Sequence, residues 1–408
     1  MKYSVLLVFL IFFGACKKEV TKTVTLKEDV VFLSDDKLEG RQTGTKGEQS
    51  AAEYIADRFK NLGMEAKGTT DGYFQKFSFK PKTDPHQEVT YNVKDGDSTI
   101  SGTNVVGFIN NNAENTVVIG AHYDHLGYGA EGSLYRGEPA IHNGADDNAS
   151  GVGVLLNLAG KLKNTNKGNN YLFIAFSGEE MGLLGSNFFV KHPTVDATKI
   201  NYMINMDMVG RLKADSTLAV YGVGTSPIFK QVLNAYGNQF KLIKKESGVG
   251  PSDHTSFYNV DIPVLHFFTG QHEDYHKPSD DWDKLNYDGM QSISDYIFNV
   301  ISDLDNNGKL PFRKTKNESE EVPRFKVGLG VIPDYLFDGK GMRIDGISED
   351  KPAQKAGLQK GDIVIKMGDS TVVDMMSYMR ALSAFEPGQK TKVVVDRKGT
   401  PVEVDIEF

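Results

Sequence analysis

The sequence has little cysteine, because one residue in 408 is a cysteine. A single thiol excludes a disulfide scaffold and any zinc site built from several thiolates. A metal ion bound to this chain would therefore need His, Asp and Glu as its ligands. An excess of positive charge is also lacking, since 46 Lys and Arg stand against 54 Asp and Glu and give a formal net charge of −8. This balance argues against nucleic acid as a partner, because a phosphate binder needs a basic surface.

The N-terminus carries an apolar run with the layout of an export signal. Lys2 precedes the run at 5–13, and the small residues Gly14 and Ala15 follow it before Cys16. The run is too short to span a bilayer as a mature helix, which favours a signal peptide. Cys16 stands where a bacterial lipoprotein signal places its lipidated residue, although Phe13 occupies a position where Leu is usual. We therefore expect residues 1–18 to be a lipoprotein signal and lipobox region, and Cys16 to anchor an exported protein to a membrane of the cell envelope. An ordinary secretory signal with a chance cysteine is the alternative.

The rest of the chain divides into a long unit, a polar segment and a short unit. The segment 306–323 is charged and poor in large apolar residues, which predicts a mobile linker. It separates a long unit at 25–305 from a short unit at 324–408. The acidic excess lies in the long unit, where a solvated acidic surface is its commonest cause.

The long unit alternates apolar β-rich runs with helical periodicity. We expect strands at 116–121, 171–176, 202–206 and 262–268, and helices at 48–62, 150–162, 227–240 and 287–304. Continuous apolar strands between amphipathic helices predict an α/β fold whose largely parallel sheet is covered by helices on both faces. Sites in such folds form at the carboxyl ends of the strands.

Residues of metal-ligand type follow these predicted strands one after another. His122 and Asp124 end the first, Glu179 and Glu180 follow the second, and Asp207 follows the third. Each motif alone has an ordinary structural explanation, such as a helix N-cap for the acids of GADDNASG at 144–151. His276, in a polar loop after the fourth strand, is favoured as a ligand over His254, which precedes that strand and begins a predicted helix. Two histidines and several carboxylates at one sheet edge predict a site for Zn²⁺, with enough carboxylate to bridge two ions. The spacing of His122 and Asp124 would let the Asp124 carboxylate accept a hydrogen bond from the second ring nitrogen of His122.

The series HYDH, GADDNASG, SGEEMGLLGS, NMDMVG and YHKPSDD resembles the dinuclear zinc exopeptidases of metallopeptidase family 28, which includes bacterial leucyl aminopeptidase. The stretch LSDDKLEGR at 33–41 is also similar to members of that family. The resemblance covers about 30–305 and implies the zinc exopeptidase fold, a mixed and largely parallel sheet sandwiched by helices.

The resemblance also implies roles for individual residues. His122 and Asp207 would hold one zinc ion and Glu180 and His276 the other, with Asp147 bridging the two. Glu179 would be the general base, and Asp124 would support His122. Members of the family often have a cis peptide bond after the bridging aspartate, so we expect one between Asp147 and Asn148.

The short unit resembles a PDZ domain, a small and mostly β fold. The segment VGLGV at 327–331 is similar to the loop with which PDZ domains receive a chain-end carboxylate, and KPA, AGL and KGDIV follow it at typical positions. The resemblance implies a peptide-binding loop at Leu329, Gly330 and Val331 and a groove wall formed by a helix at 375–384. Such a groove binds peptide or protein C-termini by strand addition. A β domain that only packs on the long unit is the alternative.

These features together predict a lipid-anchored zinc aminopeptidase that cleaves N-terminal residues from peptides, with two Zn²⁺ per chain and a PDZ domain. Two alternatives remain open. One is a glutaminyl cyclase, which shares the fold and uses a single zinc ion. The other is a non-catalytic peptide-binding lipoprotein, against which the intact Glu179 argues.

Overall fold

The computed structural model describes residues 24–69, 72–80, 90–91, 99–129, 132–316, 326–337, 339–348 and 350–408. The expected signal peptide and Cys16 lie outside these residues. Within the described ranges, no helix combines the length and the apolar character needed to cross a bilayer.

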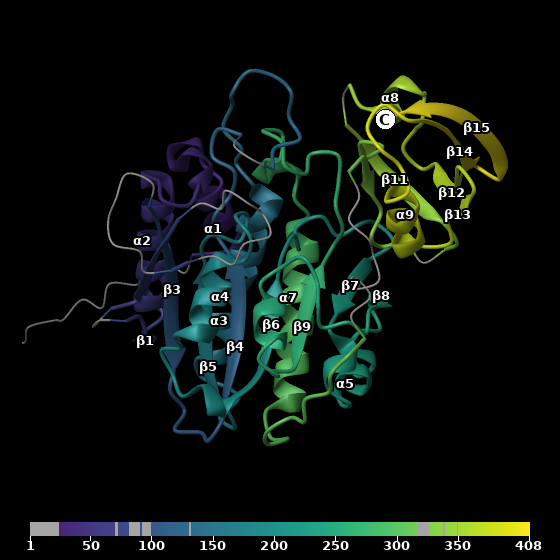
Figure 1. The fold of residues 1–408 in the computed structure, drawn as a ribbon. Helices are drawn as coiled ribbons and strands as arrows, with labels where there is room; N and C mark the ends of the chain where they lie inside the picture. The colour runs from purple at the N-terminus through teal and green to yellow at the C-terminus, as the bar shows by residue number, and fades with distance from the viewer. Residues whose placement is uncertain are drawn as a thin grey trace, which may run out of the picture.

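The described part of the long unit is built on a mixed sheet of nine strands (Figure 1). Its strand order is β1-β3-β5-β4-β6-β9-β7-β8, and β2 pairs with β3. The four central strands β5, β4, β6 and β9 are parallel to one another, whereas β5 pairs antiparallel with β3 and β9 pairs antiparallel with β7. The strands are β1 (Glu65–Ala66), β2 (Phe74–Phe79), β3 (Ile100–Ile109), β4 (Thr116–His122), β5 (Asn170–Phe176), β6 (Ile200–Met206), β7 (Thr217–Tyr221), β8 (Lys241–Lys244) and β9 (Val264–Phe268).

Helices cover both faces of this sheet, as expected from its apolar strands. Helices α1, α2, α3, α5 and α7 pack against one another on one face, while α4 and α6 pack together on the other. The helices are α1 (Leu26–Leu33), α2 (Lys46–Asn61), α3 (Gly151–Leu162), α4 (Leu184–Lys191), α5 (Phe229–Tyr236), α6 (His254–Tyr258) and α7 (Tyr287–Leu304). Shorter helical turns are η1 (Asp36–Arg41), η2 (Ala145–Ser150), η3 (Ala197–Lys199), η4 (Val223–Thr225) and η5 (Trp282–Lys284).

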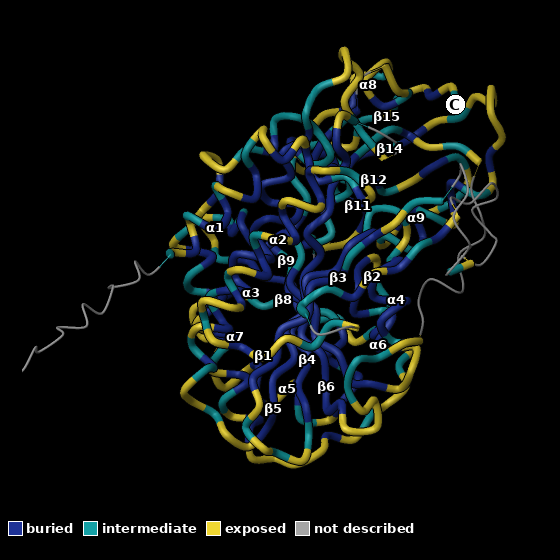
Figure 2. Tube along the Cα trace, turned by 90° about the vertical axis from the view of Figure 1, so that its left-hand side faces the viewer, coloured by how far each residue is buried: buried dark blue, intermediate teal, exposed yellow. Residues whose placement is uncertain are grey.

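Strands β4, β5 and β6 are buried along their whole length, which explains their continuous apolar sequences (Figure 2). Successive side chains of a strand point to opposite faces. Val117 and Ile119 of β4 accordingly join the core under α3, whereas Val118 joins the core under α4 and α6. The expected α/β fold is therefore confirmed.

The short unit is a small antiparallel β domain. Its six-stranded sheet within the described residues has the order β10-β11-β12-β14-β15, with β13 paired to β12. The elements are β10 (Val331–Pro333), β11 (Met342–Ile347), α8 (Pro352–Lys355), β12 (Ile363–Met367), β13 (Ser370–Thr371), α9 (Met375–Leu382), β14 (Lys390–Arg397) and β15 (Thr400–Glu407). Strand β10 is an edge of the sheet, and α9 agrees with the helix expected at 375–384.

The expectation of a free linker at 306–323 is wrong for its described part, 306–316. Leu310 is 6% exposed and belongs to the main core. Its backbone N–H donates to Asn201 at 2.7 Å, and the N–H of Thr315 donates to the Tyr258 hydroxyl at 2.9 Å. The buried side chain of Leu310 and these backbone hydrogen bonds attach the segment to the long unit, although its composition is polar.

The short unit also contacts the long unit directly, beside β7 and β8 (Figure 1). Leu336 packs into a cluster with Ala219 and Ile243, and its side chain lies against Gly270. Lys213 forms an ion pair of 3.4 Å with Asp345 across the same contact. The β domain is therefore docked near the loops that follow β9.

Candidate metal centre and catalytic site

Five residues of ligand type converge at the carboxyl edge of the central strands. His122 is the last residue of β4, Asp207 follows β6 directly, and Glu180 lies four residues beyond β5. Asp147 lies in η2, and His276 lies in the loop after β9. The edge of a parallel sheet brings these distant segments together.

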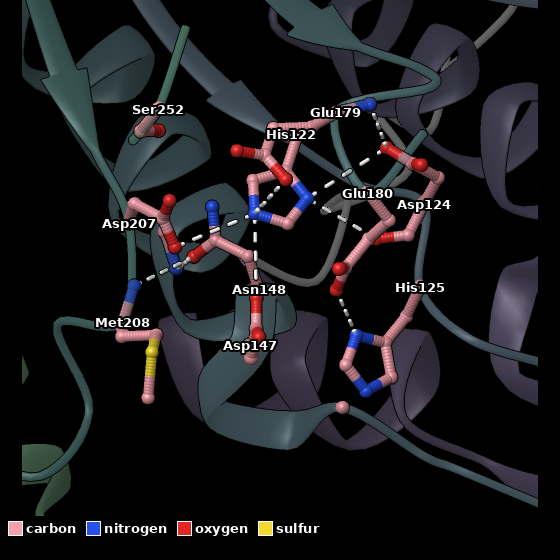
Figure 3. A network of polar contacts seen from close by, with 12 residues as sticks. His122, Asp124, His125, Asp147, Asn148, Glu179, Glu180, Asp207, Met208 and Ser252 are labelled. Atoms are coloured by element: carbon pink, nitrogen blue, oxygen red, sulfur yellow. Dashed lines mark hydrogen bonds and ion pairs between the residues drawn. The ribbon is translucent and has the colours of Figure 1, made fainter. Parts of the chain in front are cut away.

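The five side chains form two groups that share Asp147. Nε2 of His122 lies 3.3 Å from Oδ1 of Asp147 and 3.4 Å from Oδ1 of Asp207. Nε2 of His276 lies 3.2 Å from Oδ2 of Asp147 and 3.3 Å from Oε2 of Glu180. Each oxygen of Asp147 therefore faces a different histidine. Figure 3 shows the group around His122 from close by.

These distances fit metal coordination better than direct hydrogen bonding. Two ligands on a tetrahedral zinc ion, each bonded at about 2.0–2.1 Å, lie about 3.3 Å apart. All four distances fall between 3.2 and 3.4 Å. Charge-assisted N–H···O hydrogen bonds are shorter, at about 2.7–2.9 Å. The donor set, with two imidazoles and three carboxylates, also suits zinc.

The charges of the cluster suit a bound cation. Burial raises the pKa of Asp147, but the neighbouring rings of His122 and His276 outweigh it and hold that pKa well below its usual range. Burial lowers the pKa of His276, but the carboxylates of Glu180 and Asp147 raise it to about 11. Asp207 and Glu179 likewise raise the pKa of His122 well above its usual value, against the effect of burial. The pocket thus favours positive charge at the positions where ligand nitrogens would meet a metal ion.

Asp147 is held by its neighbours on both sides. The Asp280 carboxylate accepts the N–H groups of Asp146 and Asp147 at 2.9 and 3.1 Å. The Asn148 side chain donates to the carbonyl of Met206 at 3.0 Å and accepts the N–H of Met208 at 3.2 Å. The peptide bond between Asp147 and Asn148 is cis, so that expectation is confirmed.

A buried guanidinium ties two ligand-bearing segments together. Arg41 is 1% exposed and donates to the carbonyls of Tyr123 at 2.7 Å, Asn143 at 2.7 Å and Gly144 at 3.0 Å, as well as to that of Leu33. Burial lowers the pKa of Arg41 to about 10. Arg41, the last residue of the stretch LSDDKLEGR, therefore joins the end of β4 to the turn that carries Asp147.

The expected role of Asp124 needs a correction. Nδ1 of His122 lies 3.2 Å from the main-chain oxygen of Asp124 and 3.7 Å from its carboxylate. The hydrogen bond therefore goes to the main chain, because 3.7 Å is too long for one. The carboxylate instead accepts the Thr43 hydroxyl at 3.0 Å and the N–H of Glu179 at 3.2 Å. Asp124 thus supports His122 through its backbone and the segment of Glu179 through its side chain.

The sequence analysis missed His125, the second histidine of the HYDH motif. Its Nδ1 lies 2.8 Å from Oε1 of Glu180 (Figure 3). The HYDH motif shows a second histidine beside the candidate ligand His122. The sequence does not show that the fold brings it to Glu180, which is 55 positions away. His254, the weaker candidate, begins α6, is fully buried and stacks on His266 at 4.4 Å between ring centroids. It does not join either ligand-type cluster found among the described residues.

Comparisons with known proteins agree with this fold. The chain is 29% identical over 188 residues to the alkaline phosphatase isozyme conversion protein of Escherichia coli, covering 46% of this chain and 51% of that protein. It is 28% identical over 208 residues to aminopeptidase YwaD of Bacillus subtilis, covering 48% of this chain and 42% of that protein. The chain thus spans about half the length of the curated relatives it matches.

Solved structures share the fold at low identity. The LapA aminopeptidase of Legionella pneumophila aligns with a TM-score of 0.52 and 20% identity, covering 69% of this chain and 71% of that one. A glutaminyl cyclase of Bacteroides thetaiotaomicron aligns with a TM-score of 0.55 and 18% identity, covering 68% of this chain and 96% of that one.

The family model for peptidase family M28 matches residues 104–301, and the model for the PDZ domain matches residues 312–408. The chain therefore contains a peptidase family M28 domain followed by a C-terminal PDZ domain.

Proposed function

We propose that this protein is a zinc aminopeptidase that binds two zinc ions and removes N-terminal residues from peptides. The observation that carries the proposal is the pair of ligand groups that share Asp147, one oxygen facing each group at 3.2–3.3 Å. His122 and Asp207 would hold one ion, and Glu180 and His276 the other. Two bound zinc ions would lower the pKa of a water molecule and polarise the carbonyl of the scissile bond.

Glu179 is the candidate general base. Its Oε2 lies 4.0 Å from Nε2 of His122. Glu179 is therefore next to the candidate ligands, but at a longer distance than the 3.2–3.4 Å found between them. Burial, together with the negative charges of Asp207 and Glu180, raises the pKa of Glu179 well above its usual value. A carboxylate with a raised pKa is suited to take a proton from water and to pass it to the departing amine.

The proposal of aminopeptidase activity rests on the M28 domain and on the similarity to relatives such as aminopeptidase YwaD. The rival activity is that of a glutaminyl cyclase, because an enzyme with that name shares the fold. Two ligand groups that share Asp147 favour the peptidase, since the glutaminyl cyclase considered as the alternative would use one zinc ion. The zinc content of the purified protein and its activity on two substrates separate the two proposals.

The test uses an aminoacyl chromogenic amide and a peptide that begins with glutamine, each with and without a chelator. We expect two zinc ions per chain, chelator-sensitive release of the chromophore, and hydrolysis rather than cyclisation of the glutamine peptide. One ion per chain with cyclised product would identify the cyclase. Stable zinc binding without turnover of either substrate, or of a peptide library, would favour a binding protein.

We infer that the PDZ domain binds peptide C-termini at Leu329, Gly330 and Val331. The carbonyls of Leu329 and Gly330 accept the N–H groups of Ala353 and Ser348, while the structure gives their own N–H groups no acceptor among the described residues. Free N–H groups in such a loop are donors for a carboxylate. The stem of Lys351 lies over Gly330 and brings a cation near the same loop. Strand β10 is short and contains Pro333, which cannot donate to an added strand, so the bound segment would be short.

We also propose that the protein is exported and anchored to the cell envelope through a lipid on Cys16. The support is the sequence of the N-terminus alone. Metabolic labelling with a radioactive fatty acid tests it, with Cys16→Ser as the matched variant. We expect label and membrane association in the wild type and neither in the variant, whereas an unlabelled, freely released wild type would indicate an ordinary secretory signal.

A further inference from the structure

His125 lies in direct contact with one of the proposed ligands. Its side chain is 1% exposed, and its Nδ1 lies 2.8 Å from Oε1 of Glu180. The other oxygen of Glu180, Oε2, is the one that faces His276 at 3.3 Å. The two oxygens of this carboxylate therefore have different partners.

His125 could in principle be a ligand itself, since it forms a group of ligand type with Asp147 and Glu180 within 4.8 Å. The distances argue against this. Two ligands of one tetrahedral zinc ion lie about 3.3 Å apart, as the four distances of the cluster do. The 2.8 Å between Nδ1 of His125 and Glu180 is instead the length of a charge-assisted hydrogen bond.

We propose that His125 is a positioning residue, which donates its Nδ1–H to Oε1 of Glu180 and thereby turns Oε2 toward the second metal position. This inference rests on the proposed two-ion site. An ionised carboxylate can only accept, so the proton of this bond belongs to His125. Hydrogen-bond partners of ligands commonly fix the orientation of the ligand and strengthen metal binding.

The surroundings of His125 hold its ring in this orientation. A Cβ added to Gly144 would lie 2.5 Å from Cδ2 and 2.6 Å from Cγ of His125, so the ring packs directly on the backbone of Gly144. The N–H of His125 donates to the carbonyl of Arg41 at 3.3 Å. Nε2 of His125 is buried and has no partner among the described residues, which leaves Nδ1 as its bonded nitrogen.

The experiment compares His125→Asn with His125→Leu. The amide nitrogen of Asn occupies roughly the place of Nδ1 and keeps a donor for Glu180, whereas Leu keeps volume without a donor. Each variant is loaded with zinc and dialysed against a graded series of chelator concentrations, and the zinc that remains is measured. In His125→Leu we expect one of the two ions to be lost at a roughly 10- to 100-fold lower chelator concentration. In His125→Asn we expect both ions to be retained nearly as in the wild type.

A second readout separates a positioning role from direct ligation. The visible absorption of the cobalt-substituted protein reports the ligands of each ion, and we expect the same band positions in the wild type and in His125→Asn. His142→Gln is the matched control, because the ring of His142 lies 6.5 Å from that of His125 and its nitrogens bond to Ser133 and Ala140. This control should retain both ions.

Three outcomes would overturn the inference. His125→Leu could retain zinc as the wild type does. His125→Asn could lose zinc as readily as His125→Leu and change the cobalt spectrum, which would make His125 a ligand. His142→Gln could lose zinc equally, which would indicate disturbed local folding. A wild type that binds no zinc would instead remove the proposed function, and this inference with it.

Discussion

The two halves of the proposed metal site are built in different ways. His122 ends β4 and Asp207 directly follows β6, and these two strands are adjacent and parallel, with Gly120 opposite Asn205. Glu180 and His276 come from the loops after β5 and β9, which are the outer neighbours of those two strands. The inner half is thus placed by the backbone of the buried sheet, and the outer half by side-chain hydrogen bonds.

Both residues of the outer half have such a bond, whereas in the inner half the ring of His122 has one, to the main-chain oxygen of Asp124 at 3.2 Å. Glu180 takes a hydrogen bond from His125 at 2.8 Å, and Nδ1 of His276 lies 2.9 Å from the carbonyl of Gly132. A loop residue needs such partners, because a loop backbone does not restrict its side chain as a buried strand does. We therefore expect mutations outside the ligands to weaken the outer ion first.

The largest effect should follow from removing the residue that the halves share. Asp147→Ala takes away an oxygen from each group, so neither ion would keep its full set of ligands. We expect loss of both zinc ions in metal analysis and no measurable turnover. Asp146→Ala is not a suitable control, because Asp146 bonds to Gly210 and His272. Asp57→Ala, on the exposed side of α2, is the control that should change neither property. Retention of one ion would show that the halves do not depend equally on Asp147.

The next effect should separate chemistry from metal binding. Glu179→Gln keeps the shape of the side chain but removes the base, so kcat should fall about 100- to 10,000-fold while both ions stay bound. The measurements are steady-state kinetics and zinc content on the same preparation. A variant that lost zinc in proportion to activity would show that Glu179 is a ligand. Glu65→Gln, in the exposed strand β1, provides the comparison.

A smaller effect should come from changing Gly144, which packs against the His125 ring in the outer half of the site. A Cβ on Gly144 would lie 2.1 Å from the carbonyl oxygen of Asp147 as well as against His125, and Gly144 has a φ of +53°. Gly144→Ala should therefore destabilise the fold by roughly 1–3 kcal/mol and release the outer ion more easily than the inner one. Gly308→Ala has a similar φ of +65° and no atoms within 4 Å of the new Cβ, so it isolates the conformational cost. Equal behaviour of the two variants in thermal melting and zinc retention would contradict the prediction.

The smallest effect concerns protons. Nearby carboxylates raise the pKa of His276 to about 11 in the metal-free chain, so the ring is protonated at pH 7. Asp207 and Glu179 also raise the pKa of His122. A protonated ring must lose its proton to bind a metal ion, so zinc binding at pH 7 should release at least about one proton per chain, from His276. Calorimetric titration of metal-free protein in buffers of different ionisation enthalpy measures this number, and release of no protons would contradict the cited pKa directions.

The positions of four of the five candidate ligands were predictable because the sequence marks the ends of the buried strands, whereas Asp147 was assigned from the family resemblance. Continuous apolar runs identified β4, β5, β6 and β9, and the residues after them were the candidates. Shorter or partly exposed strands were missed, such as β8, because its sequence KLIK gives only a weak pattern over four residues.

Contacts between distant segments were not predictable in the same way. Nothing in the HYDH motif specifies that His125 meets Glu180, or that Asp124 offers its main-chain oxygen to His122. The segment 306–323 was expected to be mobile from its composition, yet Leu310 in its described part enters the main core. Such contacts depend on where the fold brings a side chain, which the local sequence does not encode.

Anomalous X-ray diffraction from crystals of the zinc-loaded protein tests the two-ion account most directly. The account predicts two zinc peaks about 3.5–4 Å apart, with one oxygen of Asp147 bonded to each. His122 and Asp207 should complete the ligands of one ion, and Glu180 and His276 those of the other, with Nδ1 of His125 outside bonding distance of both. A single zinc peak, or a peak bonded to His125 in place of His276, would contradict it.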